Sequence, residues 1–259
     1  MLTSELLFQL LPLIFLVAAL YASVGHGGAS GYLAVVSLLG LATKSFVPLI
    51  LTLNVLVAGT SFLNYRRPGA FTFRDLLPFI VTSMPAAYLG GMVKVPAAAF
   101  NAILAVALIL AAVRLLMPKH IKGPEALRRK SAETSLWAIG LPVGLVLGFV
   151  SGMIGIGGGI FLSPILLFLG LTDMKGSAAM ASSFIVLNSL AGLAGHVAQI
   201  ATLYRAEPAV PIAFLVVAFT GGLVGSLWGA TRRGPRVLQW ALACVLLFAS
   251  FKLGSSLFL

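Results

Sequence analysis

A cluster of glycines interrupts an apolar segment that runs from about Leu136 to Leu171. Four of the five residues from Gly155 to Gly159 are glycine. Each glycine inside a helix costs roughly 1 kcal/mol relative to alanine, so the cluster predicts a break in the helix. Lipid offers no hydrogen bonds, so backbone groups freed within a bilayer must be buried in protein or line a wet cavity. The break therefore predicts a close packing contact or a binding site.

The rest of the chain is apolar enough to place that break in a membrane. Of its 259 residues, 60% are hydrophobic and 9% are charged, and the mean hydropathy is +1.09. These values are typical of a polytopic membrane protein. The net charge of +11 does not indicate nucleic-acid binding, because Lys and Arg fall in short clusters between apolar segments, as in cytoplasmic loops. The segment up to Leu20 lacks the basic start of a signal peptide, so we expect it to be retained. Cys244 is the single cysteine, which excludes an internal disulfide and a cysteine metal cluster.

A second glycine motif, Gly25-His26-Gly27-Gly28, occurs in the first half of the chain. Its three glycines fall on those at 155, 157 and 158 with a constant offset, and the same order of apolar segments surrounds each motif. We therefore predict an internal duplication, with repeats 1–117 and 136–259 and a basic linker, 118–135. Each repeat has one broken segment followed by three longer ones. The apolar segments are about 6–24 with 30–41, 46–64, 76–93 and 97–117, then 137–154 with 160–171, 177–200, 209–230 and 237–258.

The distribution of Lys and Arg favours inverted over parallel repeats. If each broken segment crosses the membrane once, the repeats are parallel and 11 basic residues lie in the cytoplasm against 6 outside. If each segment dips in and returns, the repeats are inverted and the count becomes 13 against 4, which the positive-inside rule favours. Whether the segments cross or re-enter stays open. We predict an all-α polytopic membrane protein of two homologous, inverted repeats, each a re-entrant-like broken helix plus three transmembrane helices, with the linker 118–135 cytoplasmic.

The paired motifs form the candidate binding site. A helix break exposes backbone N–H groups, and the N-terminus of the following arm carries roughly half a positive charge. Glycine lets a ligand approach those groups without a Cβ in the way. Two such termini from opposed repeats predict a site for a small oxyanion near the membrane midplane. Close helix packing through small residues is the alternative. The candidate residues are Gly25, His26, Gly27, Gly28, Gly155, Gly157, Gly158 and Gly159.

Polar residues within the apolar segments extend the candidate site. Asn54 and Asn188 occupy matching positions in the two repeats, and amide N–H groups suit oxyanions as donors. Ser182 and Ser183 precede Asn188 by one to two turns, although adjacent serines diverge around a helix. For all four residues, hydrogen bonding between helices is the alternative.

Two histidines and two lysines have more than one interpretation. His26 occupies the position of Ile156 in the second motif, and it could donate to an anion or titrate near neutral pH. His196, late in the segment 177–200, is the other histidine in a membrane segment, and both could instead be structural. Lys44 and Lys175 follow the short arms, where they could attract anions or be ordinary loop charges.

The sequence argues against enzyme activity. The run 155–159 is no nucleotide fingerprint, because no strand precedes it, no acidic residue follows some 20 positions later, and no Gly-Lys-Ser/Thr ends it. All six acidic residues lie at segment ends or in loops. Paired carboxylates, a Ser-His-Asp set and a His cluster with metal spacing are all missing from the sequence. We therefore predict no enzyme, no cofactor and no metal.

The second motif and its surroundings identify a family. The run Gly155–Gly159, followed by Ser163-Pro164-Ile165-Leu166 and preceded by a basic central loop, resembles the TauE/SafE family of sulfite-exporter-like anion permeases. The matching motif in the first half departs from the pattern, because Ala29 stands where the third glycine would be and no proline follows. The resemblance covers almost the whole chain.

The resemblance implies a multi-pass carrier in a bacterial inner membrane that exports sulfite, sulfoacetate or a related sulfur-containing anion. The residues by themselves indicate only a small anion. A non-transporting membrane scaffold that uses the glycines for packing is the alternative, and a membrane enzyme ranks third. The anion itself, the coupling ion, the direction of transport and the oligomeric state, a homodimer included, stay open.

Overall fold

All regular secondary structure in the described part of the chain is helical. A computed structural model describes residues 4–66, 73–116, 133–169, 171–172, 174–197, 209–231 and 236–255. The first half contains α1 (Ser4–Ala22), α2 (Ala29–Leu38), the short 3-10 helix η1 (Thr43–Phe46), α3 (Val47–Tyr65), α4 (Phe73–Met92) and α5 (Ala97–Leu116). The second half contains α7 (Glu133–Ile154), α8 (Gly159–Phe168), α9 (Met174–Gly195), α11 (Ala209–Thr231) and α12 (Arg236–Ser255). The predicted all-α class is confirmed. Of the expected linker 118–135, residues 118–132 lie outside the described residues.

The helices have the length and surface of membrane helices. Four of the described stretches are long and apolar enough to cross a membrane: Thr43–Tyr65, Leu136–Ile154, Lys175–Gly195 and Ala209–Thr231. Large apolar side chains also stay exposed on the outside of the bundle, among them Val146 at 59% and Phe248 at 64%. A water-soluble surface rarely exposes so much contiguous apolar area, whereas a lipid-facing surface requires it.

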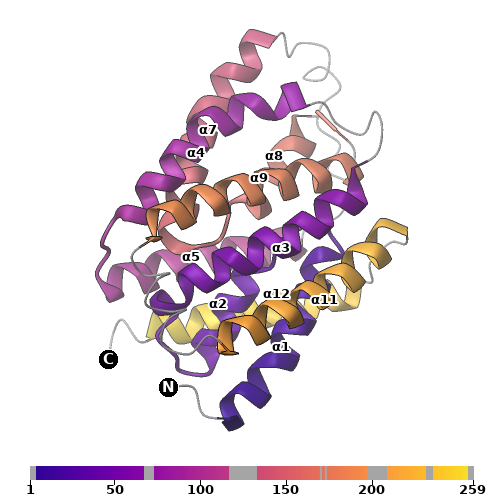
Figure 1. Cartoon of the computed structure of the whole chain (residues 1–259). Helices are drawn as coiled ribbons and strands as arrows, with labels where there is room; N and C mark the ends of the chain where they lie inside the picture. Colours follow the sequence, from indigo (N-terminus) through magenta and orange to yellow (C-terminus); the bar gives the residue numbers. More distant parts are fainter. Residues whose placement is uncertain are drawn as a thin grey trace.

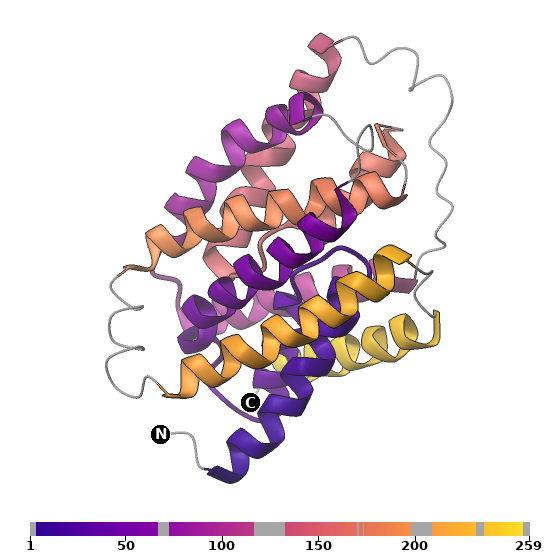
Figure 2. The ribbon, with the colours of Figure 1, turned by 45° about the vertical axis from the view of Figure 1, so that its right-hand side comes forward.

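The two halves interlock around α3 and α9, which lie at the centre of the bundle (Figure 1). Helices α4 and α7 pack on one side of this pair, and α1 and α11 pack on the other. Figure 2 shows the same pairs from a second direction. Helix α5 packs on α12, where Ser250 Oγ donates to the Ala105 carbonyl oxygen at 2.9 Å. Each pair therefore joins one helix from each half, and the main buried cluster draws on both halves.

The corresponding helices α3 and α9 run antiparallel. Near the start of α3, Leu51 lies 3.4 Å from the position of a Cβ built on Gly192, near the end of α9. At the other end, Tyr65 closes α3 in a buried cluster with Ala178 and Ala179, near the start of α9. Inverted repeats require this orientation of two corresponding helices that pack on each other, so the packing favours the inverted arrangement.

Rows of glycine bring α7 onto α4 and α11 onto α1. The glycines of each row are four residues apart, so they share one helix face. A Cβ at any of them would overlap a backbone carbonyl oxygen of the partner helix. Such rows let membrane helices approach closely. Close packing, the alternative for the motif glycines, is thus also a role of glycines outside the motifs, which the sequence did not single out. They are Gly144, Gly148 and Gly152 of α7, and Gly221, Gly225 and Gly229 of α11.

Both predicted helix breaks occur, at matching positions. Gly25 and Gly28 have φ angles of 81° and 98°, and Gly155 and Gly158 have φ angles of 79° and 73°. Gly157 also has a positive φ, of 77°. Residues with a Cβ are strained in this left-handed region, so the backbone of the breaks requires glycine.

The second arm of the first break folds back on the first arm. Helices α2 and α8 have 10 residues each, about 15 Å at 1.5 Å per residue, and end before the expected boundaries at 41 and 171. A Cβ on Gly31 of α2 would lie 2.6 Å from a side-chain carbon of Val17 in α1. The hydroxyls of Tyr21 and Ser30 are 2.5 Å apart across the break. The start of the second arm therefore packs on the end of the first arm, a contact that a re-entrant segment would also make.

Candidate functional site

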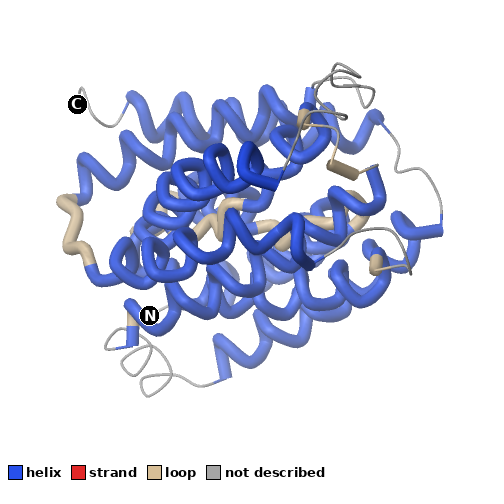
Figure 3. Tube along the Cα trace, turned by 90° about the horizontal axis from the view of Figure 1, so that it is seen from above, coloured by secondary structure: helices blue, strands red, loops and turns tan. Residues whose placement is uncertain are grey.

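The two breaks meet inside the bundle at Asn54 of α3. A Cβ on Gly27 would collide with Asn54 Oδ1, and a Cβ on Gly157 would lie 3.0 Å from Asn54 Nδ2. Both glycines also face the side chain of Ile185 in α9. Figure 3 shows loop segments in the interior of the bundle, surrounded by helices. The corresponding glycines of the two motifs therefore converge on one buried place.

Asn54 ties the two breaks together. Its Oδ1 accepts from the N–H of Ala29, the first residue of α2, at 3.2 Å. Its Nδ2 donates to the carbonyl oxygen of Ile156 in the second break, also at 3.2 Å. The side chain is fully buried, so loss of either bond would leave an unpaired polar group inside the protein. Asn54 is thus a structural bridge. Its Nδ2 carries two N–H groups, and these two bonds use only one of them.

Asn188, the counterpart of Asn54, makes no such bridge. Its Nδ2 donates to the carbonyl oxygen of Phe184, one turn earlier in α9, at 2.9 Å. Its Oδ1 is buried and has no partner among the described residues. The next residue, Ser189, buries an Oγ that also lacks a partner in the described part of the chain, 3.0 Å from the position of a Cβ on Gly157. Asn54 therefore binds both breaks, and the second break also faces the hydroxyl of Ser189, which has no partner among the described residues.

Backbone N–H groups of the second break also lack acceptors. Within the described residues, no acceptor is found for the N–H groups of Gly157, Gly158 and Gly159, and all three residues are buried. In the first break the same is true of Gly27 and Gly28. Buried backbone N–H groups are paired in nearly all native proteins, by protein, water or a ligand. Among the described residues, these groups therefore lack the partner that buried N–H groups normally have.

His26 links the first break to the second half of the chain. Its Nδ1 lies 3.0 Å from the carbonyl oxygen of Val24, and its Nε2 lies 3.1 Å from Ser163 Oγ in α8. The same hydroxyl lies 3.1 Å from the carbonyl oxygen of Gly159. Ser61 Oγ of α3 donates to the His26 carbonyl oxygen at 3.5 Å. With 7% of its surface exposed, the imidazole lies between the two breaks.

Four candidate residues make only packing or local contacts among the described residues. Ser182 and Ser183 donate their hydroxyls to carbonyl oxygens one turn earlier in α9, at 2.8 and 2.9 Å. Gly25 packs against α9, and Gly155 packs against α3. The structure thus brings together Gly27, Gly157 and Asn54, with His26 beside them. The two serines and the two glycines described above make local contacts instead.

Sequence analysis missed three hydroxyl groups of this region. Ser163 belongs to the run that carries the resemblance, but its contact with His26 was not anticipated. Ser189 follows Asn188, a candidate residue. Tyr32 Oη is buried, has no partner in the part of the chain that the structure describes, and lies 2.9 Å from the position of a Cβ on Gly28. Only their position in the sequence, next to motif residues, could have indicated them.

Comparison with known proteins assigns the family. A family model described as "Sulfite exporter TauE/SafE" matches residues 10–253. The chain belongs to the TauE/SafE family. A relative from Sinorhizobium fredii (strain NBRC 101917 / NGR234), named "Probable membrane transporter protein y4hK", is 31% identical over 239 residues, which are 92% of this chain and 94% of the relative. No solved structure matches significantly. The resemblance is confirmed, and the findings support a multi-pass membrane transporter.

Lys44 and Lys175 of this TauE/SafE protein each bind a backbone carbonyl oxygen, at matching places in the two halves. Lys44 Nζ donates to the carbonyl oxygen of Val95, just after α4. Lys175 Nζ donates to the carbonyl oxygen of Ala230, at the end of α11, at 2.8 Å. Cations near a helix C-terminus interact favourably with its dipole, so Lys175 anchors the end of α11, whereas Lys44 binds the segment that connects α4 to α5. His196 Nδ1 bonds to the carbonyl oxygen of Gly192 in its own helix, at 2.9 Å.

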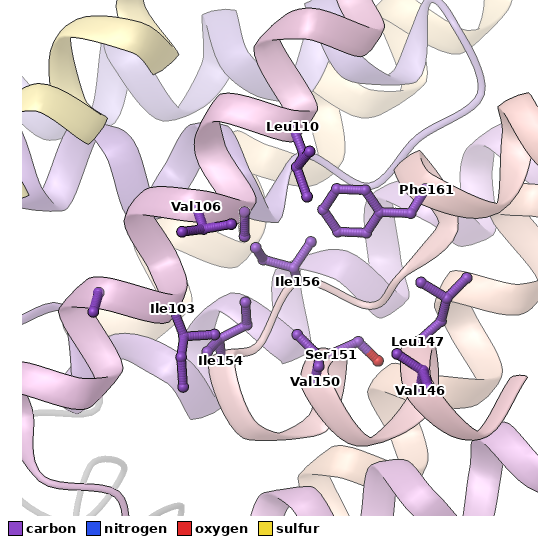
Figure 4. A pocket seen from close by; sticks show the side chains of 12 residues that line it. Ile103, Val106, Leu110, Val146, Leu147, Val150, Ser151, Ile154, Ile156 and Phe161 are labelled. Atoms are coloured by element: carbon purple, nitrogen blue, oxygen red, sulfur yellow. The ribbon is translucent and has the colours of Figure 1, made fainter. Parts of the chain in front are cut away.

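An apolar cavity of about 540 Å³ lies between α5 and α7 beside the second break of the TauE/SafE protein. Figure 4 shows Val106 and Leu110 facing Ile156 and Phe161 across it. None of its lining residues is charged, and Ser151 carries the one polar side chain among them. The cavity reaches Ile156 within the break, but it offers little to an anion.

Proposed function

We propose that this TauE/SafE protein is a secondary transporter that exports a small sulfur-containing oxyanion, such as sulfite or a sulfonate, and binds it at the paired helix breaks. The family description supplies the substrate class. The observation that carries the site is a set of buried polar groups at the second break that find no partner within the described ranges, namely three successive N–H groups and Ser189 Oγ. The residues concerned are Gly157, Gly158, Gly159 and Ser189.

An oxyanion would satisfy these groups at once. The N–H groups precede or open α8, so they lie at the positive end of its dipole, where anions bind readily. Each unpaired buried group costs about 1–3 kcal/mol, which a bound anion would offset. The Ser189 hydroxyl is a further donor, and the remaining N–H of Asn54 is another. Across the site, Gly27, Gly28 and the Tyr32 hydroxyl offer the same chemistry from the first break.

The interlocked packing supports transport by alternating access. Broken helices from two inverted repeats commonly form transporter sites near the membrane midplane. Here the breaks meet beside the antiparallel pair α3 and α9. We also propose that the protein lies in a bacterial inner membrane and that the linker 118–135 faces the cytoplasm. The distribution of Lys and Arg supports this orientation.

Two serines of one helix provide a matched test. Ser189→Ala removes the unpartnered hydroxyl, whereas Ser182→Ala removes a hydroxyl that bonds to its own helix. A hydrogen bond to a charged group contributes about 1.5–3 kcal/mol, so Ser189→Ala should raise the KM for sulfite roughly tenfold or more. Ser182→Ala should stay close to wild type. The assay is counterflow of radiolabelled sulfite in phosphatidylethanolamine–phosphatidylglycerol vesicles that contain the full chain.

The results of this assay distinguish a wrong binding site from a wrong function. Equal KM values in the two variants would refute the site at the second break. Wild-type vesicles that exchange no member of a panel of sulfur oxyanions would refute the transporter and favour the scaffold. Gly157→Leu is a weaker test, because its positive φ and three side-chain atoms 3.0 Å from a Cβ would disturb the fold as well.

A further inference from the structure

We propose that His26 binds one proton together with each anion, so that the carrier moves a proton and an anion in the same direction. The proposal rests on the proposed anion site at the breaks. The second motif has Ile156 at the position of His26, so each chain has one such group between its breaks. The inference depends on the hydrogen bonds of the imidazole and on its place beside two helix N-termini.

The neighbours of His26 fit the neutral imidazole. Nδ1 faces the carbonyl oxygen of Val24, which can only accept, so Nδ1 carries a hydrogen. Nε2 then has a lone pair, and the Ser163 hydroxyl, 3.1 Å away, donates to it. Both ring nitrogens are therefore paired when His26 carries no charge.

The same neighbours fit the protonated imidazole. Nε2 then carries a hydrogen as well and donates to Ser163 Oγ. The Ser163 hydroxyl turns its own hydrogen to the carbonyl oxygen of Gly159, 3.1 Å away. His26 can therefore gain a proton while both of these ring contacts are kept, with the Ser163 hydroxyl turned from Nε2 to the Gly159 carbonyl oxygen. Imidazole is the side chain that changes charge between about pH 5 and 8.

An anion at the breaks would couple to this proton. His26 is almost fully buried, two residues before Gly28, the N-cap of α2, and it contacts Ser163 in the N-terminal half of α8. The N-termini of both helices carry partial positive charge, which opposes a protonated imidazole unless an anion offsets it. The proton and the anion therefore each raise the affinity for the other, by the same factor.

Other titratable groups on the elements around His26 do not replace it as the proton site. The tyrosines of α1, α2 and α3 are neutral throughout the pH range of imidazole. The lysine of α9 is bound to a carbonyl oxygen, and the glutamate of α1 lies at the far end of that helix. These groups are Glu5, Tyr21, Tyr32, Tyr65 and Lys175.

The test measures protons moved per anion in vesicles that contain the full chain. The substrate is isethionate, a sulfonate, because the charge of a strong acid stays constant across the pH range used. A trapped pH dye records proton entry while radiolabelled isethionate enters down its gradient. Wild type should move about one proton per isethionate, and external acid should accelerate uptake. His26→Gln, which keeps an N–H donor for Ser163, should give a ratio near zero, whatever its rate. His196→Gln should keep the ratio near one, because His196 bonds to its own helix.

The outcomes distinguish this inference from the proposed function. A ratio near zero in wild-type vesicles that still exchange isethionate would overturn the proton site and leave the transporter standing. Vesicles without any exchange would instead overturn the transporter. If His26→Gln fails to fold, the binding of isethionate to Ser163→Ala in detergent decides the matter. The pH midpoint of its affinity should shift from that of wild type, and an unchanged midpoint would overturn the proposal.

Discussion

Asn54 and Asn188 occupy the same place in the two repeats but make different contacts. Asn54 bridges two chain segments, whereas the amide nitrogen of Asn188 bonds to its own helix and its Oδ1 has no partner. Both side chains are fully buried. One repeat thus uses its asparagine to hold the breaks together, and the other leaves polar atoms beside its break. A duplicated sequence therefore does not imply a duplicated role.

Alanine substitution at the two asparagines should affect stability unequally. Asn54→Ala leaves the Ala29 N–H and the Ile156 carbonyl oxygen without their partner, at about 1–3 kcal/mol for each group left buried and unpaired. Asn188→Ala removes only a bond within α9. Thermal unfolding of the purified protein in detergent should show the larger fall in Tm for Asn54→Ala. Equal falls would contradict the bridging role of Asn54.

At the scale of helices, glycine serves two separate purposes. Five of the seven motif glycines, all except Gly27 and Gly159, adopt positive φ angles where one helix ends and the next begins. The glycines in rows on α7 and α11 lie within regular helices and let backbones touch. Packing therefore does not account for the positive φ angles of the breaks, and the breaks do not explain why α7 can lie so close to α4.

A side chain in a glycine row should separate the paired helices. A Cβ at Gly148 would overlap the backbone of Ser83 in α4, so Gly148→Val should lower stability by about 1–3 kcal/mol or more. Gly59 of α3 is the control, because a Cβ there meets no atom within 4 Å. Gly59→Ala should unfold at the wild-type temperature or above it, since alanine favours a helix. A wild-type Tm for Gly148→Val would refute the row as a packing contact.

At the scale of the whole molecule, each half of the chain packs mainly on the other half. Helix α1 of the first half packs on α11 of the second half, and α4 packs on α7. Helices α3 and α9 pack on each other and run in opposite directions (Figures 1 and 2). Neither half therefore has a complete core of its own. If the repeats are inverted across the membrane, corresponding helix ends must emerge on opposite faces.

Cysteine labelling tests that arrangement at the ends of α3 and α9. Arg66 and Val197 follow these helices and are both exposed. In a Cys244→Ser background, Val197→Cys should react with a membrane-impermeant maleimide in intact cells. Arg66→Cys should react only after permeabilisation, because the distribution of basic residues places it in the cytoplasm. Labelling of both positions from the same side would rule out inverted repeats.

By itself, the sequence determines the helical membrane class, the order of the helices and the position of both breaks. These properties depend on short stretches, because hydropathy sets a membrane helix and the missing Cβ of glycine sets its interruption. The predicted boundaries differ from the structure by three or four residues at the ends of α2 and α8, where apolar residues continue beyond the helix, and at the starts of α4 and α7, which begin earlier than predicted. The family, too, follows from a local run of residues and is confirmed by the match over 10–253.

Only the tertiary structure decided which helices pair and which polar groups meet. The bridge from Asn54 to Ile156 joins residues 102 positions apart, and the contact of His26 with Ser163 joins residues 137 positions apart. No local pattern distinguishes Asn54 from Asn188, or Ser189 from Ser182. Whether a buried polar group is paired or left for a ligand depends on what the rest of the fold brings beside it.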